Sequence, residues 1–85
     1  MLTGAEFLKV CSRSDPEWIS FCNGYVQAAF DGVRLPGKSI CAPSFLTRTK
    51  IVGAVVEHLT KTPALQKQNA ALVVYAVLAI AFPCQ

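Results

Sequence analysis

The chain has 85 residues, of which 53% are hydrophobic and 15% charged, and its formal net charge is +3. This composition excludes a disordered chain, and the length predicts one domain over residues 1–85 with a small core. The eight lysines and arginines are spread along the chain, whereas a nucleic-acid-binding protein usually gathers them on one face. We therefore expect no nucleic-acid partner. No apolar run reaches the roughly 20 residues that a membrane-spanning helix needs.

Start signals in the first half of the chain predict two helices. Thr3 and Glu6 form a capping box, in which each side chain binds the backbone N–H of the other residue, and a helix is expected over residues 3–13. Ser14 begins a second box, and a helix is expected over residues 14–32, where glycine suits the C-terminal cap. At helical spacing this second segment places one apolar stripe toward a core: Trp18, Phe21, Cys22, Tyr25 and Ala29.

The second half of the chain predicts two further helices joined by a short turn. Residues 33–43 contain helix-breaking prolines and a glycine and are expected to form an ordered loop. A third helix is expected over residues 44–59, and its inward-facing positions are Ile51, Val52, Val55, Val56 and Leu59. Thr62 followed by Pro63 is expected to start a fourth helix. The fourth helix is apolar on every face over residues 70–82, which is typical of a helix in the middle of a bundle.

Four cysteines, Cys11, Cys22, Cys41 and Cys84, constrain the fold most strongly. An even number in so short a chain predicts two disulfides and an oxidising compartment. A metal site is not expected, because no pair has the short spacing of zinc ligands and His58 is the only histidine. Antiparallel third and fourth helices bring Cys84 to Cys41, and a hairpin of the first two brings Cys11 near Cys22; two other pairings stay open. The predicted fold class is all-α, a small four-helix bundle (or four helices plus a short turn) stapled by two disulfides.

The ionisable residues do not form a recognisable catalytic set. His58 follows Glu57 near the end of the third predicted helix, where a histidine usually interacts with the helix dipole. With the cysteines paired, no thiol remains for a Cys–His nucleophile, and the chain has no glycine-rich phosphate loop. We therefore expect no enzymatic activity, no cofactor and no bound metal.

Binding is the remaining kind of function, and rigid loops on a packed bundle suit it because little entropy is lost when they bind. Two segments are candidates for contact with a protein partner, although simple connectors have the same composition. One comprises Arg34, Leu35, Pro36, Gly37 and Lys38. The other comprises Lys61, Thr62, Pro63, Leu65, Gln66, Lys67 and Gln68.

Five pieces of the chain follow one another in the order and spacing of a known family. They are Phe7–Cys11, Cys22–Val26, Ile40–Pro43, Ile51–Pro63 and Ala70–Cys84. Together they resemble the Rap/Tai family of type VI secretion immunity proteins. The resemblance implies a small, all-helical periplasmic protein, often a homodimer. It also implies binding to a cognate peptidoglycan amidase toxin of the papain-like cysteine class, whose active-site groove the immunity protein blocks.

Together with the predicted disulfides, the resemblance leads us to expect a periplasmic protein in its mature form, with the signal peptide absent from this sequence. Valine, alanine and isoleucine side chains of the third helix are candidates for a dimer face if they are exposed. An alternative function is that of a small acid-stress chaperone resembling the periplasmic Hde proteins, although five acids are few for an acid-driven switch. A lipid-binding core is a weaker alternative, because four cysteines are fewer than plant lipid-transfer proteins use.

Overall fold

The structure is a computed structural model, and it describes residues 2–32, 40–41, 43 and 45–84. No regular strand lies among these residues, so the fold is all-α, as the sequence predicts. Within the described ranges, four α-helices and one short 3-10 helix follow one another: α1 (Gly4–Cys11), α2 (Pro16–Gly32), α3 (Arg48–Lys61), η1 (Pro63–Lys67) and α4 (Ala70–Ala81).

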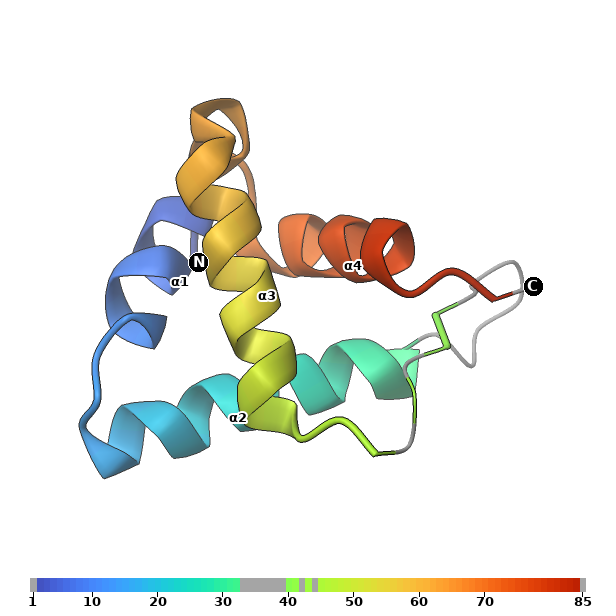
Figure 1. Cartoon of the computed structure of the whole chain (residues 1–85). Helices are drawn as coiled ribbons and strands as arrows, with labels where there is room; N and C mark the ends of the chain where they lie inside the picture. The colour runs from blue at the N-terminus through green and yellow to red at the C-terminus, as the bar shows by residue number, and fades with distance from the viewer. Residues whose placement is uncertain (1, 33–39, 42, 44, 85) are drawn as a thin grey trace.

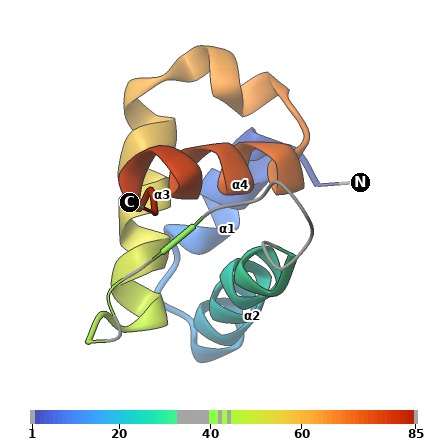
Figure 2. The same ribbon diagram turned by 90° about the vertical axis from the view of Figure 1, so that its right-hand side faces the viewer.

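The helices gather around α3, which packs against α1, α2 and α4. In Figure 1 and in the perpendicular view of Figure 2, α3 stands upright while α4 lies across it. The expected antiparallel pairing of these two helices is therefore wrong. The η1 turn and the bend at Asn69 lie between them and redirect the chain before α4 begins.

Both predicted disulfides are present. Cys11 pairs with Cys22, with their Cα atoms 5.8 Å apart, and Cys41 pairs with Cys84, with their Cα atoms 5.0 Å apart. The second bond is reinforced by the backbone N–H of Cys41, which donates to the carbonyl oxygen of Phe82 at 2.7 Å. The disulfides thus join α1 to α2, and the segment after α2 to the segment after α4.

The first capping box forms as the sequence predicts, whereas the prediction of a second box beginning at Ser14 is wrong. The backbone N–H of Thr3 donates to the carboxylate of Glu6 at 2.9 Å, and the Thr3 hydroxyl accepts from the N–H of Glu6 at 3.2 Å. Helix α2 begins at Pro16 instead of near Ser14, and the carbonyl of Asp15 accepts its first backbone bonds. Proline suits a first helical position because that position needs no N–H donor.

Helix α3 begins later than the predicted start at residue 44, which lies outside the described residues. Its N-cap is Thr47, whose hydroxyl accepts from the backbone N–H of Lys50 at 3.2 Å. A threonine with extended backbone that binds this N–H supplies one of the acceptors that a helix start requires. Arg48 is consequently in the first turn of α3 and not in its second.

The predicted fourth helix is divided into two elements. Thr62 makes no capping bond through its side chain, and Pro63 begins the short η1 helix. The side-chain oxygen of Asn69 accepts from the N–H groups of Ala71 (2.9 Å) and Leu72 (3.3 Å), and this cap starts α4. The prediction of one continuous helix is therefore wrong. An asparagine side chain can accept from the free N–H groups of a new helix start, and this competes with continuation of the preceding helix.

The core lies where α3 and α4 meet α1 and α2. Its fully buried side chains come from all four helices: Phe7, Cys22, Val26, Val55, Leu59, Val73, Val74, Val77 and Leu78. The predicted inward positions of α3 are confirmed, with Ile51 and Val52 buried and Val56 packed against the core. These valines and isoleucines therefore do not supply the exposed dimer face that the sequence suggested on this helix.

The predicted apolar stripe of α2 is partly wrong. Phe21 is 40% exposed, whereas Val26, which the stripe omitted, is completely buried. Phe21 instead stacks between its neighbours on the helix surface, with ring centroids 5.6 Å from Trp18 and 5.8 Å from Tyr25. Aromatic rings on the surface of a helix can bury part of their area against one another, and here the smaller Val26 occupies the core position.

The expectation that α4 is buried on every side is also wrong. Leu72 is 65% exposed and Ile80 is 69% exposed. Only one face of α4, carrying Val73, Val77 and Leu78, enters the core. A chain this short has too few helices to surround one of them, so an apolar face is left at the surface.

Candidate functional site

The second segment that the sequence predicts to contact a partner lies at one end of α3. We call residues 61–68 the corner; it is drawn in orange at the top of Figure 1. Lys61 is the last residue of α3, Thr62 joins the helices, and Gln68 follows η1. The other predicted segment, residues 34–38, lies outside the described residues.

The backbone of the corner is held against the start of α1. The N–H of Gly4 donates to the carbonyl of Gln68 at 2.8 Å, and the N–H of Ala70 donates to the carbonyl of Leu2 at 2.8 Å. These two bonds flank an antiparallel bridge between Thr3 and Asn69. Segments distant in sequence thus fix both sides of the turn before α4.

A side chain holds the corner from within. The amide of Gln66 donates to the carbonyl of Leu59 at 2.9 Å, in a partly buried position. Leu59 lies in the last turn of α3, where a helix leaves carbonyls without an intrahelical partner. The same carbonyl also accepts from the N–H of Thr62 at 3.3 Å, so Gln66 adds a second bond that ties η1 to the end of α3. Leu65 is half-buried against the core.

The outward surface of the corner carries positive charge. Lys61, Pro63, Lys67 and Gln68 are exposed, whereas Thr62, Leu65 and Gln66 are half-buried. Lys61 lies 3.0 Å from the carboxylate of Glu57, with side chains 72% and 69% exposed. An ion pair this exposed contributes little to stability. The corner thus presents lysine, proline and glutamine side chains on a fixed backbone, which suits binding.

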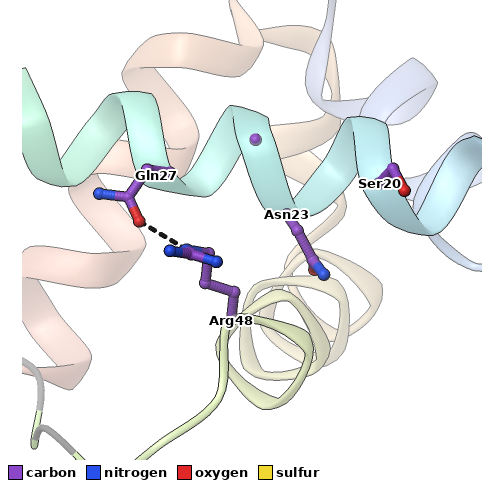
Figure 3. A pocket seen from close by; sticks show the side chains of 5 residues that line it. Ser20, Asn23, Gln27 and Arg48 are labelled. Carbon is purple, nitrogen blue, oxygen red and sulfur yellow. Dashed lines mark hydrogen bonds between the residues drawn. The ribbon is translucent and has the colours of Figure 1, made fainter.

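A second surface, which sequence reasoning missed, is a shallow polar hollow between α2 and the start of α3. It has a volume of about 370 Å³ and is lined by Ser20, Asn23, Gly24, Gln27 and Arg48. Figure 3 shows Arg48 reaching from the start of α3 to lie beside Gln27 of α2. We call this feature the polar hollow.

Hydrogen bonds between helices hold the side chains of the polar hollow. The Nε–H of Arg48 donates to the side-chain oxygen of Gln27 at 2.5 Å, and the amide of Asn23 donates to the hydroxyl of Thr49 at 3.3 Å. The sequence signal for this surface is the pair of cations, Arg48 and Lys50, directly after a threonine N-cap. The misplaced start of the third helix hid that signal.

A third surface is the outer face of α4. Leu72, Ala76 and Ile80 are exposed and recur at every fourth residue, so they lie along one side of the helix. Sequence reasoning noticed that α4 is apolar on all faces but assigned every face to the core.

The described residues contain no group of three or more His, Cys, Asp or Glu side chains suited to holding a metal ion. All of the cysteines are in disulfides. His58 is half-buried on α3. No nucleophile–base pair is recorded in the described part of the chain.

The perturbed ionisable groups support the fold rather than a reactive centre. The backbone N–H and the hydroxyl of Thr3 hold the pKa of Glu6 below its usual value. The guanidinium of Arg13, which contacts Asp15 at 3.1 Å through two bonds, lowers the pKa of that carboxyl. Burial raises the pKa of Tyr25.

The comparisons with known proteins agree with a binding function. None of the described helices has the length and apolar character needed to cross a membrane. No curated protein matches the chain. The family model of the Rap1a immunity proteins matches residues 3–84, which is nearly the whole chain. Immunity proteins bind and inhibit a toxin and are not enzymes. The chain therefore belongs to the Rap1a immunity proteins.

Proposed function

We propose that this protein protects its cell from a type VI secreted peptidoglycan amidase by binding the toxin and blocking its active-site groove. The observation that carries the proposal is the corner, residues 61–68, a turn with exposed side chains on a backbone fixed by hydrogen bonds to α1. A turn held in one conformation loses little entropy when it enters a groove, so more of its contact energy becomes affinity.

Inhibition by occlusion requires no chemistry of the immunity protein itself. Pro63 and Lys67 of the corner are exposed and accessible to a partner. A side chain that occupies the toxin's groove keeps peptidoglycan from the catalytic cysteine, and the inhibitor is not consumed. Residues 34–38, the second predicted segment, stay a prediction for an additional contact.

Two disulfides support the periplasm as the place of action, because such bonds persist in oxidising compartments. Peptidoglycan lies in the same compartment, so an amidase that cuts it acts there. The proposed location therefore places inhibitor, toxin and toxin substrate together.

The experiment titrates the oxidised protein against the type VI amidase encoded beside its gene and follows peptidoglycan cleavage. Loss of activity at about one equivalent is the expected result. Lys67→Glu in the corner is expected to raise the amount needed, whereas Lys9→Glu, an equal charge change on an exposed residue of α1, is not. Unchanged cleavage at excess protein, with no complex on a sizing column, would contradict the proposal for that toxin.

The homodimer that the family resemblance implies stays a prediction. The exposed apolar residues of α4, Leu72, Ala76 and Ile80, are the surface that the structure offers for it instead of α3. Sedimentation at several protein concentrations, with Ile80→Glu as the comparison, tests this assignment.

A further inference from the structure

The polar hollow and the corner lie at opposite ends of α3. Arg48 is the first residue of α3 and Lys61 is the last. The helix has 14 residues, so its ends are about 20 Å apart at 1.5 Å per residue. A function of the polar hollow is therefore separate from insertion of the corner into a groove.

The first turn of α3 carries charge of the unfavourable sign. Arg48 and Lys50 lie in this turn, which contains no acidic residue. The N-terminus of a helix carries partial positive charge, so cations there are disfavoured and acids are preferred. The positive charges of these two residues therefore do not stabilise the start of α3, whereas they favour the binding of a negatively charged group.

Three carboxylates are engaged away from Arg48: Glu6 with Thr3, Asp15 with Arg13, and Glu57 with Lys61. In this part of the chain, Gln27 is the recorded partner of the Arg48 guanidinium, and it is uncharged.

The bond to Gln27 also orients the guanidinium. It engages the Nε–H, and among the side chains that the structure describes no partner of the terminal amino groups of Arg48 is seen. An arginine whose plane is already fixed loses less entropy when it forms charge-assisted bonds to a carboxylate. Phe45, which lies shortly before it in the chain, is 83% exposed. Arginine and aromatic side chains are typical of the residues that dominate protein interfaces.

We propose that the polar hollow is a second contact surface that receives a carboxylate side chain from the protein partner, with Arg48 as its charged anchor. The identity of that partner as the toxin rests on the proposed function. The other lining residues, Ser20, Asn23, Gly24 and Gln27, are uncharged, so a carboxylate in the polar hollow meets no competing negative charge from them. The toxin is then held at two separated points, the corner and the polar hollow.

Gly24 offers a sharp test, because a side chain added there meets nothing within 4 Å. Gly24→Glu places a carboxylate on the lining of the polar hollow, and this carboxylate is expected to bind the Arg48 guanidinium and so block a carboxylate of the partner. Gly53→Glu is the matched control, since Gly53 is also helical, exposed and open at its Cβ position, but is not part of the lining. Arg48→Gln removes the anchor directly.

The first measurement uses a capped tetraglutamate peptide as the probe and a capped tetraglutamine peptide as its control, followed by NMR. Saturable shifts at the side chains of Asn23, Gln27 and Arg48 with tetraglutamate alone are expected. Arg48→Gln and Gly24→Glu are expected to weaken this binding about tenfold, the size of one charge-assisted bond, while Gly53→Glu leaves it nearly unchanged. Shifts spread over the other surface lysines, or none at all, would overturn the proposal.

The second measurement determines the affinity of the same variants for the amidase. Weaker binding by Gly24→Glu and Arg48→Gln, but not by Gly53→Glu, supports contact at the polar hollow. If only corner variants weaken binding, the proposed function stands and the second contact is refuted. If the wild-type protein does not bind the amidase, the proposed function fails for that toxin, while the peptide measurement still decides whether the polar hollow receives a carboxylate.

Discussion

Gly4 of α1 lies directly against the backbone of Leu65 in the corner. A Cβ atom at Gly4 falls 2.5 Å from the carbonyl oxygen of Leu65 and 3.1 Å from the Cα of Gln66. Only glycine allows α1 to approach η1 this closely, and the approach permits the N–H of Gly4 to reach the carbonyl of Gln68. The conformation of the corner therefore depends on the absence of a side chain on another helix.

Gly4→Ala is expected to destabilise the protein by about 1–3 kcal/mol, because the obstructing atoms are backbone and cannot move aside alone. The matched control is Gly53→Ala, whose Cβ meets nothing within 4 Å. It is expected to stabilise α3 by about 0.5–1 kcal/mol, since alanine loses less backbone entropy than glycine. Urea unfolding of both variants gives the comparison, and equal stabilisation by the two changes would contradict the close approach.

Asn69→Ala is expected to cost about 1 kcal/mol, because the start of α4 then loses the acceptor for two N–H groups. Thr62→Ala is the control at the start of η1, where the threonine side chain makes no capping bond. Its expected effect is within about 0.5 kcal/mol. Thermal unfolding measures both variants. A larger loss for Thr62→Ala would mean that the predicted start at residue 62 contributes more than the bend before α4.

Two leucines of α4 are expected to respond differently to the same truncation. Leu78 is fully buried, and Leu78→Ala is expected to cost about 2–5 kcal/mol through lost contacts and the cavity left behind. Leu72 is 65% exposed, and Leu72→Ala is expected to change stability by no more than about 0.5 kcal/mol. Chemical unfolding at low protein concentration tests the pair. Similar losses at both positions would show that the outer face of α4 is covered.

The capping box of α1 makes stability depend on pH. The bonds from Thr3 lower the pKa of Glu6 from its usual 4.5, so the ionised carboxylate stabilises the folded state. This contribution is complete above the pKa of the unfolded chain and is lost as the pH falls through the lower pKa of the folded chain. Glu6→Gln keeps the geometry of the box without titrating there.

The urea midpoint of the wild type is therefore expected to fall more between about pH 5 and about pH 3 than that of Glu6→Gln. The pKa of Asp15 is also lowered, so the stability of both proteins falls on acidification. The Glu6 contribution is the difference between the two curves. Parallel curves for the two proteins would refute a stabilising role for the ionised Glu6.

Local signals in the sequence were sufficient for much of the fold and for part of the candidate site. The capping box at Thr3 and the apolar spacing of α3 depend only on neighbours in the chain, and both are confirmed. The corner was a candidate contact segment because of its proline, lysine and glutamine residues, although most of it was assigned to the predicted fourth helix. The cysteine pairs were also confirmed, although the antiparallel helices that led to Cys41 and Cys84 were not.

The sequence by itself determined that the chain is helical and that it contains two disulfides. The helical character follows from apolar spacing and capping residues, which depend on neighbours in the chain. The two disulfides follow from the even number of cysteines. Only the tertiary structure decided the crossing of α4 over α3, the exposure of Leu72 and Ile80, and the meeting of Gln27 with Arg48. These features arise when helices compete for one small core. Which face is buried then depends on the partners available and not on the hydrophobicity of the helix alone.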